Sequence, residues 1–292
     1  MSFIREIRTQ IRSVGGTQKI TRAMEMVAAS KMRKAQAHRL ASQAYVKRMQ
    51  ALMYEVVAAC IDDAPHPYLQ VRAAQRVGII LVSSDRGLCG GLNTNLFKFL
   101  VEQLQSFSKV SDAPAVSLGL VGHKATTFVK RLNCEVLAQV EHLGDTPQLQ
   151  DFIGIIKVML DRYRAAQLDR VLIASNSFVN TMTQKPRLLP LLPIVPSEAS
   201  LIEPISRPTA YLYEPDKQAL LSLLMTRYIE SQTYQAVMEN IACEQAARRV
   251  SMKNATENAD ELIGQLHRSY HKARQAAITR ELAEIVSGAE AV

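Results

Sequence analysis

Residues 17–64 read TQKITRAMEMVAASKMRKAQAHRLASQAYVKRMQALMYEVVAACIDDA, a run without glycine or proline. At the other end of the chain, residues 216–287 contain one glycine, Gly264, and no proline. At a rise of about 1.5 Å per residue, these stretches predict helices of roughly 70 and 105 Å. A compact globule of this length would be only roughly 50 Å across. We therefore expect the two helices to protrude and to pack on each other or on a partner.

The N-terminal stretch carries one apolar stripe at helical spacing. It begins before a glycine pair, Gly15-Gly16, where we expect the helix to be interrupted and to restart at Thr17. The stripe is predicted to follow Phe3, Ile4, Ile7, Ile11, Val14, Ile20, Met24, Val27, Lys31 and Ala35, and then Met49, Leu52, Met53, Val56 and Val57.

The C-terminal stretch carries a heptad stripe whose residues are mostly small or polar, which makes a poor leucine zipper. An antiparallel pairing with the N-terminal helix is favoured, because small residues allow close approach. The alternative is that both ends cover a long surface in a helical bundle. The stripe is Leu224, Tyr228, Ser231, Gln235, Met238, Ala242, Gln245, Arg249, Met252, Thr256, Ala259, Ile263, Leu266, Tyr270, Ala273 and Ala277.

The middle of the chain alternates apolar strands with helical stretches, which is typical of β-α-β units on a mostly parallel sheet. The expected strands are 77–82, 115–121, 134–140 and 171–174, and the expected helices are 95–107, 124–132 and 149–166. Residues 177–196 predict an irregular edge hairpin with three prolines. The predicted fold is thus an α/β Rossmann-like central domain (70–205) plus a long antiparallel α-helical coiled coil formed by the N-terminal (1–64) and C-terminal (210–292) segments.

Charge is distributed unevenly along the chain. Residues 1–60 hold 11 Lys and Arg against 3 Asp and Glu, so this segment has a formal charge of +8, equal to that of the whole chain. This predicts an acidic partner surface: nucleic acid, anionic lipid or acidic protein. The absence of tryptophan argues against base stacking. No apolar stretch approaches the ~20 residues that span a bilayer, no secretory signal is recognised, and the four separated cysteines are expected to be reduced thiols in the cytosol.

Residues 83–93 lie between a strand and a helix, where α/β folds bind phosphates. Their glycine spacing fits neither dinucleotide nor P-loop motifs, so a structural turn is preferred and no cofactor is expected. Cys89 could be a nucleophile with His66, His123 or His142 as its base, but a buried structural cysteine is preferred.

Two further patterns have a functional and a plain interpretation. His267 and His271 could bind a metal, although a solvated helix face is preferred and no metal site is predicted. The basic group Lys31, Arg33, Lys34 and Arg39 could bind nucleic acid, but no recognition-helix context accompanies it.

Several stretches together resemble the γ subunit of bacterial F-type ATP synthase. They are GTQKITRAMEMVAASKM at 16–32, the turn at 85–95, Glu239-Asn240 with EQAAR at 244–248, and ITRE at 278–281 with Glu284 and Gly288-Ala289. The resemblance covers essentially the whole chain.

The resemblance implies a non-catalytic central-stalk rotor that couples proton flow through the c-ring to ATP synthesis. Its partners would be three α and three β subunits, the ε subunit and the c-ring, at the cytoplasmic face of the bacterial plasma membrane, with membrane contact only through the c-ring and none with nucleic acid. By similarity, the candidate contacts to the α/β ring are Met24, Arg248, Arg274, Gln275, Thr279 and Glu281, and those of the c-ring and ε foot are Tyr211 and Glu214.

The sequence alone is also compatible with two other classes of function. One is a Rossmann-like enzyme with helical arms, which tight nucleotide binding to the isolated chain would favour. The other is a basic coiled-coil nucleic-acid binder, which a steeply salt-dependent affinity for DNA would favour.

Overall fold

The computed structural model describes residues 2–59, 66–108, 114–132, 134–194 and 217–290. In chain order its elements are α1 (Ser2–Ala59), β1 (Arg76–Val82), α2 (Leu92–Ser108), β2 (Ala115–Val121), α3 (His123–Val129), β3 (Glu135–Val140), α4 (Leu149–Arg164), β4 (Arg170–Phe178), β5 (Gln184–Leu192) and α5 (Lys217–Glu290). They form two compact units. The smaller unit is residues 1–30 with 248–292, and the larger is residues 31–247.

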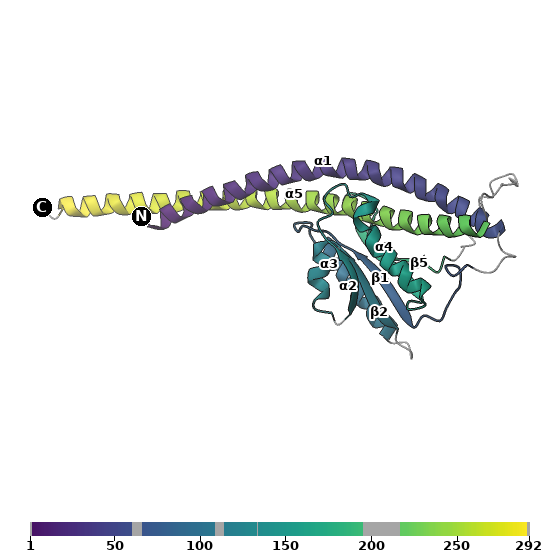
Figure 1. Cartoon of the computed structure of the whole chain (residues 1–292). Helices are drawn as coiled ribbons and strands as arrows, with labels where there is room; N and C mark the ends of the chain where they lie inside the picture. The colour runs from purple at the N-terminus through teal and green to yellow at the C-terminus, as the bar shows by residue number, and fades with distance from the viewer. Residues whose placement is uncertain (1, 60–65, 109–113, 133, 195–216, 291–292) are drawn as a thin grey trace. The chain divides into compact units, whose positions relative to one another are not determined.

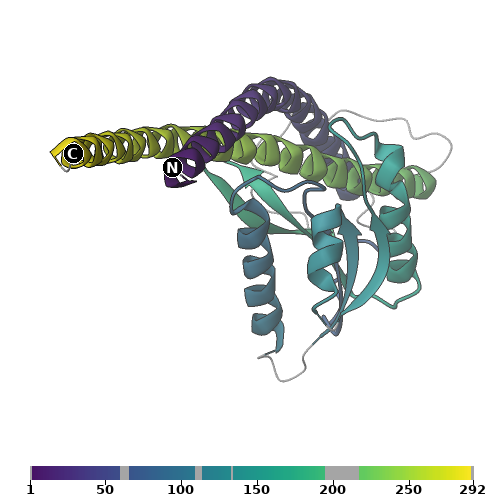
Figure 2. The ribbon, with the colours of Figure 1, turned by 90° about the vertical axis from the view of Figure 1, so that its left-hand side faces the viewer.

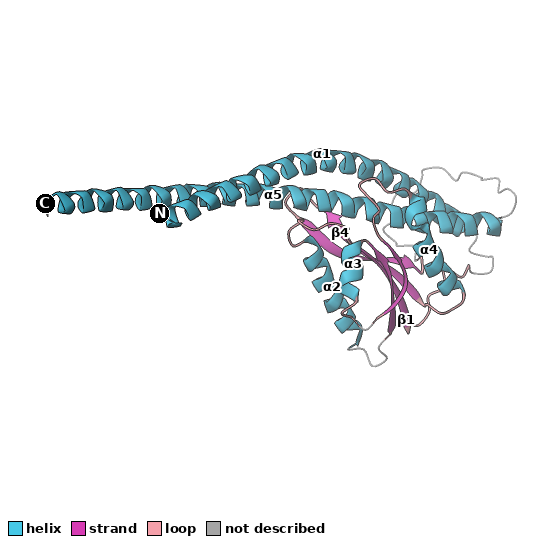
Figure 3. Cartoon of the chain, turned by 60° about the vertical axis from the view of Figure 1, so that its left-hand side comes forward, coloured by secondary structure: helices cyan, strands magenta, loops and turns pink. Residues whose placement is uncertain are grey.

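The larger unit is built on one five-stranded sheet with the order β3-β2-β1-β4-β5; its strands are magenta in Figure 3. β1 pairs in parallel with β2 and β4, and β2 pairs in parallel with β3. β5 runs antiparallel to β4 at the edge of the sheet. Proline lacks an N–H group, and an edge strand tolerates this because one of its sides has no neighbouring strand. The predicted parallel sheet and its proline-bearing edge hairpin are confirmed.

Helices cover both faces of this sheet (Figures 1 and 2). Ile79 and Leu81 of β1 point to one face, where they pack with α2 and α3. Ile80 and Val82 point to the other face, where they join a core made with α4, residues 31–59 of α1 and residues 217–247 of α5. A strand buried on both faces needs a continuous apolar run, which is what residues 77–82 supply.

Within the larger unit, α5 is a core helix as well as a long one. Residues 236–247 are all buried, including the charged Glu239 and Glu244. A helix buried on every side normally has an apolar sequence. Glu239 is retained here because β4 and β5 supply partners for its carboxylate, as described below.

The helix α1 continues without a break through Gly15-Gly16, so the predicted interruption is wrong. Neither glycine adopts a left-handed conformation, and a Cβ atom on either would meet nothing within 4 Å. Glycine is about 1 kcal/mol less favourable than alanine inside a helix. Contacts of the neighbouring turns with α5 are sufficient to offset that cost, since Ile7 and Thr21 are both buried.

None of the helices in the described ranges combines the length and apolar character needed to cross a membrane.

Candidate functional site: helix surfaces and the carboxyl edge of the sheet

In the smaller unit, the N-terminal part of α1 and the C-terminal part of α5 run antiparallel, side by side (Figure 1). Their shared seam is small and polar. The hydroxyls of Thr21 and Thr256 lie 2.8 Å apart, and the Gln18 side chain donates to the Asp260 carboxylate. The predicted stripe on α5 is confirmed here, because Met252, Thr256 and Ala259 are buried and the following stripe positions up to 277 are partly buried.

Near the beginning of α1, the seam ends in a cationic contact. Arg8 Nη2 donates to the Tyr270 hydroxyl at 2.8 Å, and the guanidinium lies 5.6 Å from the centre of the Tyr270 ring. A cation over a tyrosine ring contributes typically 0.5–1 kcal/mol at an exposed site, as an order-of-magnitude estimate. This contact adds one specific pairing between the two helices at this end of the seam.

The stripe predicted on α1 is wrong at Ile20 and Val27, although Ile7 and Ala35 of the same stripe are buried. The side chains of Ile20 and Val27 are 62% and 53% exposed, and Met26 beside them is 63% exposed. The seam runs one position further along, through Thr21 and the buried Ala28. Close approach to α5 selects small residues at these two turns, so Ile20, Met26 and Val27 are left on the outer face of the pair.

The last turns of α5 have no partner among the described residues. Positions 278–287 and 289 are exposed, and this end extends beyond the beginning of α1 (Figure 1). Four aliphatic residues at helical spacing form one stripe on it, here called the C-terminal stripe: Ile278 (45% exposed), Leu282 (57%), Ile285 (67%) and Val286 (56%). An unpartnered apolar stripe of this kind marks an interaction surface.

The ring-contact candidates are distributed over both helices. Arg274, Gln275, Thr279 and Glu281 are exposed near the C-terminal stripe, whereas Met24 is half-buried on α1 and Arg248 is buried on α5. The two foot candidates, Tyr211 and Glu214, lie outside the described residues.

The loop that follows β1 is closed by its own contacts. Ser83 Oγ accepts from the Ala125 N–H at 2.8 Å, and Asn93 Nδ2 donates to Ser84 Oγ at 2.7 Å. Gly122, at φ +93°, lies against this loop, where a Cβ atom would come within 2.5 Å of the Ser83 carbonyl oxygen. The loop therefore uses its polar atoms to join β1 to the turn after β2.

The helix α5 fills the crevice at the carboxyl edge between β1 and β4, where doubly wound folds bind ligands. Asn176 Nδ2 donates to Asn240 Oδ1 at 2.9 Å, and Cys243 Sγ donates to the Asn176 carbonyl at 3.6 Å. Burial raises the pKa of the Cys243 thiol. Cys89 packs against Cys243 in one small buried cluster. The arrangement favours the structural-turn interpretation of residues 83–93 over a nucleotide site.

One acidic side chain fastens α5 to the edge hairpin. The Glu239 carboxylate accepts from Arg187 Nη2 at 2.5 Å, from the Phe178 N–H at 2.9 Å and from Ser177 Oγ at 3.1 Å. In the sequence, Glu239-Asn240 stood out only through its resemblance to the γ subunit family, and no contact was predicted for it. The available signal was a glutamate and an asparagine inside an otherwise small and apolar helical run.

The candidate bases for Cys89 bond elsewhere. His66 lies 3.0 Å from Ser222 Oγ, and burial together with the Arg164 guanidinium lowers its pKa. His123 Nδ1 lies 2.9 Å from the Glu141 carboxylate, and its ring stacks on that of His142. Asn93 Nδ2 donates to the buried Cys89 sulfur at 3.4 Å. These contacts support a structural cysteine.

His267 and His271 stack with ring centres 6.4 Å apart on an exposed face of α5. In the described part of the chain, no cluster of three or more His, Cys, Asp or Glu side chains is arranged to hold a metal ion. Of the four basic residues considered for nucleic acid, Lys31 pairs with Asp145 at 2.6 Å and Arg39 lies over the Phe178 ring at 5.3 Å. These two cations are therefore engaged within the chain.

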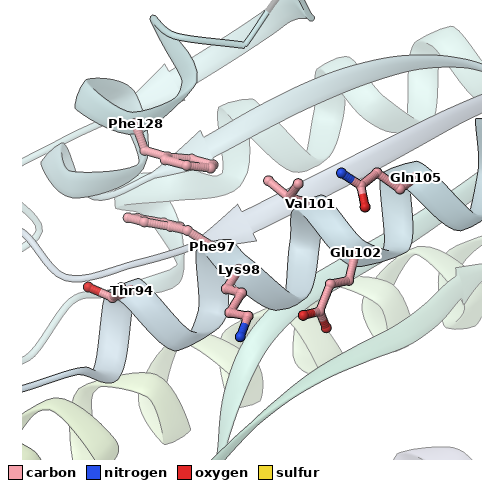
Figure 4. A pocket seen from close by; sticks show the side chains of 7 residues that line it. All are labelled: Thr94, Phe97, Lys98, Val101, Glu102, Gln105 and Phe128. Carbon is pink, nitrogen blue, oxygen red and sulfur yellow. The ribbon is translucent and has the colours of Figure 1, made fainter.

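A shallow groove of about 580 Å³ lies between α2 and α3, on the face of the sheet away from α5 (Figure 4). The rings of Phe97 and Phe128 stack at one end of it with centres 4.2 Å apart. Val101 continues the apolar floor, and Lys98 and Glu102 stand on its flank. The groove is open and mostly apolar, which suits a docking surface rather than a catalytic site.

Comparisons with known proteins agree over the whole chain. The protein-family model described as ATP synthase matches residues 3–292. The ATP synthase gamma chain of Coxiella burnetii is 53% identical over 294 aligned residues, covering 100% of both chains. That of Nitrosococcus oceani is 50% identical over 292 residues, again covering 100% of both.

Two solved structures share the fold. A chain of the Euglena gracilis mitochondrial ATP synthase OSCP/F1/c-ring structure is 20% identical with a TM-score of 0.68, covering 99% of this chain and 94% of that chain. A chain of the Tetrahymena thermophila mitochondrial ATP synthase central stalk/c-ring structure is 22% identical with a TM-score of 0.59, covering 81% and 99%. From the family model and the full-length relatives, the chain belongs to the ATP synthase gamma chain family.

Proposed function

We propose that the chain is the central-stalk rotor subunit of a bacterial F-type ATP synthase. In this role it couples proton flow through the c-ring to ATP synthesis on a ring of three α and three β subunits, and it regulates their ATPase activity. The chain itself carries out no chemistry. Membership of the gamma chain family supports the proposal.

The observation that carries the proposal is the C-terminal stripe on α5. Its aliphatic side chains remain roughly half exposed or more, although burying apolar surface stabilises by about 25 cal/mol per Å². A protein surface that exposes such a stripe on the end of a helix is built to insert it into an apolar partner. A ring of α and β subunits that surrounds the end of the helix provides that environment.

The outer face of the helix pair suits a rotating part. The exposed Ile20, Met26 and Val27 lie on one side of α1, so the pair has no rotational symmetry. Each angle of such a rotor presents different contacts to the three β subunits and shifts their equilibrium between open and closed states. The small polar seam keeps the two helices in register while their outer side chains meet the ring.

We propose the residue roles by similarity to the gamma chain family. Exposed residues beside the C-terminal stripe, with Met24 and Arg248, are proposed contacts to the α/β ring: Arg274, Gln275, Thr279 and Glu281. Tyr211 and Glu214 are proposed contacts to the c-ring and ε subunit. The chain is then a peripheral protein at the cytoplasmic face of the plasma membrane, held there through the c-ring.

The test is affinity purification of the full-length tagged chain from its own membranes. We expect α, β, ε and c subunits to co-purify, with ATP hydrolysis in the complex and none at enzyme-like rates in the isolated chain. Recovery of the chain alone, or of a complex with nucleic acid whose affinity falls steeply with salt, would reject the proposal.

A further inference from the structure

We infer that residues 141–145, the first part of the loop between β3 and α4, are a clasp that fixes both long helices to the sheet. Asp145 and Asp85 are its two positioning residues. The inference rests on the proposed function, because it concerns how a rotor passes torque between its helices and its α/β domain.

On the helix side, one carboxylate reaches both helices. Asp145 Oδ2 accepts from Lys31 Nζ of α1 at 2.6 Å, and Asp145 Oδ1 accepts from Gln245 Nε2 of α5 at 3.4 Å. Lys31 is the first residue of the larger unit, and Gln245 is close to its last, Ala247. The clasp therefore holds both helices at the same end of that unit.

On the sheet side, a second carboxylate holds the loop. Asp85, which follows β1, accepts three backbone N–H bonds, each 3.0 Å long, from His123, His142 and Leu143. Bonds from N–H groups to a carboxylate are roughly twice as strong as neutral ones. Asp85 thus joins the ends of β1, β2 and β3 through one side chain.

The backbone of the loop is shaped for this purpose. His142 has φ +62° and Gly144 has φ +72°, so two of its five residues adopt the left-handed conformation. That conformation is uncommon for a residue other than glycine and persists only where its surroundings hold it. The bond from the His142 N–H to Asp85 provides such a hold.

The clasp complements the apolar contacts of the same helices. Apolar burial is non-directional, so it resists separation of a helix from the sheet more than sliding or turning along it. Hydrogen bonds have preferred distances and angles. The two bonds to the two oxygens of Asp145 therefore favour one rotation and height of both helices relative to the sheet.

The experiment uses the assembled complex in inverted membrane vesicles and measures the ratio of ATP-driven proton pumping to ATP hydrolysis. The variants are Asp145→Ala, Lys31→Ala, the double variant, and the charge exchange Lys31→Asp with Asp145→Lys. The matched control is Asp161→Ala, because the carboxylate of Asp161 also forms an exposed ion pair, with Arg164, but on a single helix.

We expect Asp145→Ala to lower the ratio about twofold, the shift that loss of one partly exposed ion pair typically produces in an equilibrium. The double variant should match the more affected single variant, and the charge exchange should recover at least half of the loss. A ratio for Asp145→Ala equal to that of Asp161→Ala, or a charge exchange without recovery, would overturn the inference.

Amide hydrogen exchange provides a second measurement on the same full-length chain, whether or not a variant assembles. Asp85→Asn should speed amide exchange at His142 and Leu143. Asp145→Ala should speed amide exchange in the helical turn of α1 that follows Lys31. Unchanged exchange at both places would also overturn the clasp. Failure of the unaltered chain to pump or hydrolyse with α and β subunits would instead reject the proposed function, leaving the exchange result to decide the clasp.

Discussion

Replacing Glu239 with alanine should loosen α5 from the edge hairpin of the sheet. Glu239 keeps 6% of its side chain exposed and accepts bonds from Arg187, Ser177 and the Phe178 N–H. Alanine removes both acceptor oxygens, so all three bonds are lost at once and the Arg187 guanidinium is left without its carboxylate partner.

The magnitude follows from the burial of the two partners. Removing one member of a fully buried ion pair costs about 3–5 kcal/mol. Arg187 keeps 29% of its side chain exposed, so water can replace part of the lost contact, and we take the lower end, about 3 kcal/mol of unfolding free energy. Glu239→Gln keeps one oxygen for the Phe178 N–H and should cost about 2 kcal/mol.

The assay is thermal unfolding of the full-length chain followed by circular dichroism. A loss of about 3 kcal/mol lowers the midpoint by roughly 6–12 °C in a chain of this size. Glu230→Ala is the matched control, because Glu230 is similarly buried but pairs with Arg227 on its own helix. The double variant Glu239→Gln with Arg187→Met should be less destabilised than the sum of its single variants. Equal midpoints for Glu239→Ala and Glu230→Ala would refute the assigned role.

Three other expectations follow from the structure. Replacing Gly15 and Gly16 with alanine should stabilise α1 by about 1 kcal/mol per site, because open space surrounds both; a lower unfolding midpoint would contradict this. Hydrogen bonds from Arg76 hold the pKa of the Asp169 carboxyl below its ordinary value of 3.8. The contribution of this carboxylate to stability is therefore complete above that value and is lost as the pH falls through the folded-state pKa. Asp169→Asn should therefore flatten the acid limb of the unfolding profile, and an unchanged limb would count against it. Leu282→Asp with Ile285→Asp should leave the midpoint of the free chain unchanged, since both side chains are exposed, but should lower the yield of assembled complex several-fold; normal yield would show that this stripe is not buried in the ring.

Much of the fold could be predicted from the period of apolar residues. β2 spans 115–121 as expected, and the other strands and the helices α2 to α4 begin within a few residues of their predicted positions. Strands buried on both faces leave continuous apolar runs, which are easy to recognise. The continuity of α1 through Gly15-Gly16 could not be predicted, because local propensity disfavours it and contacts of the adjoining turns decide it.

The candidate site was less accessible to sequence reasoning. Ile20 and Thr21 lie on neighbouring stripes of α1, and only the spacing required by α5 decides which of them faces the seam. Likewise, Glu239 gains its role from Arg187 and Phe178 on a hairpin far away in sequence. The exposed residues at the end of α5 were identified by resemblance, and their contacts with a ring stay predictions.

The filling of the sheet crevice by α5 has a consequence for synthesis. The ribosome completes β5, the last strand in the described part of the chain, at Leu192, but the side chains that occupy the crevice arrive only with Glu239 to Cys243, in the final quarter of the chain. Until then the nascent chain exposes the buried face of β4 and an unpaired Arg187. Such intermediates are prone to aggregate. A chain truncated before Glu239 should therefore aggregate, because it lacks the side chains that bond to this part of the sheet.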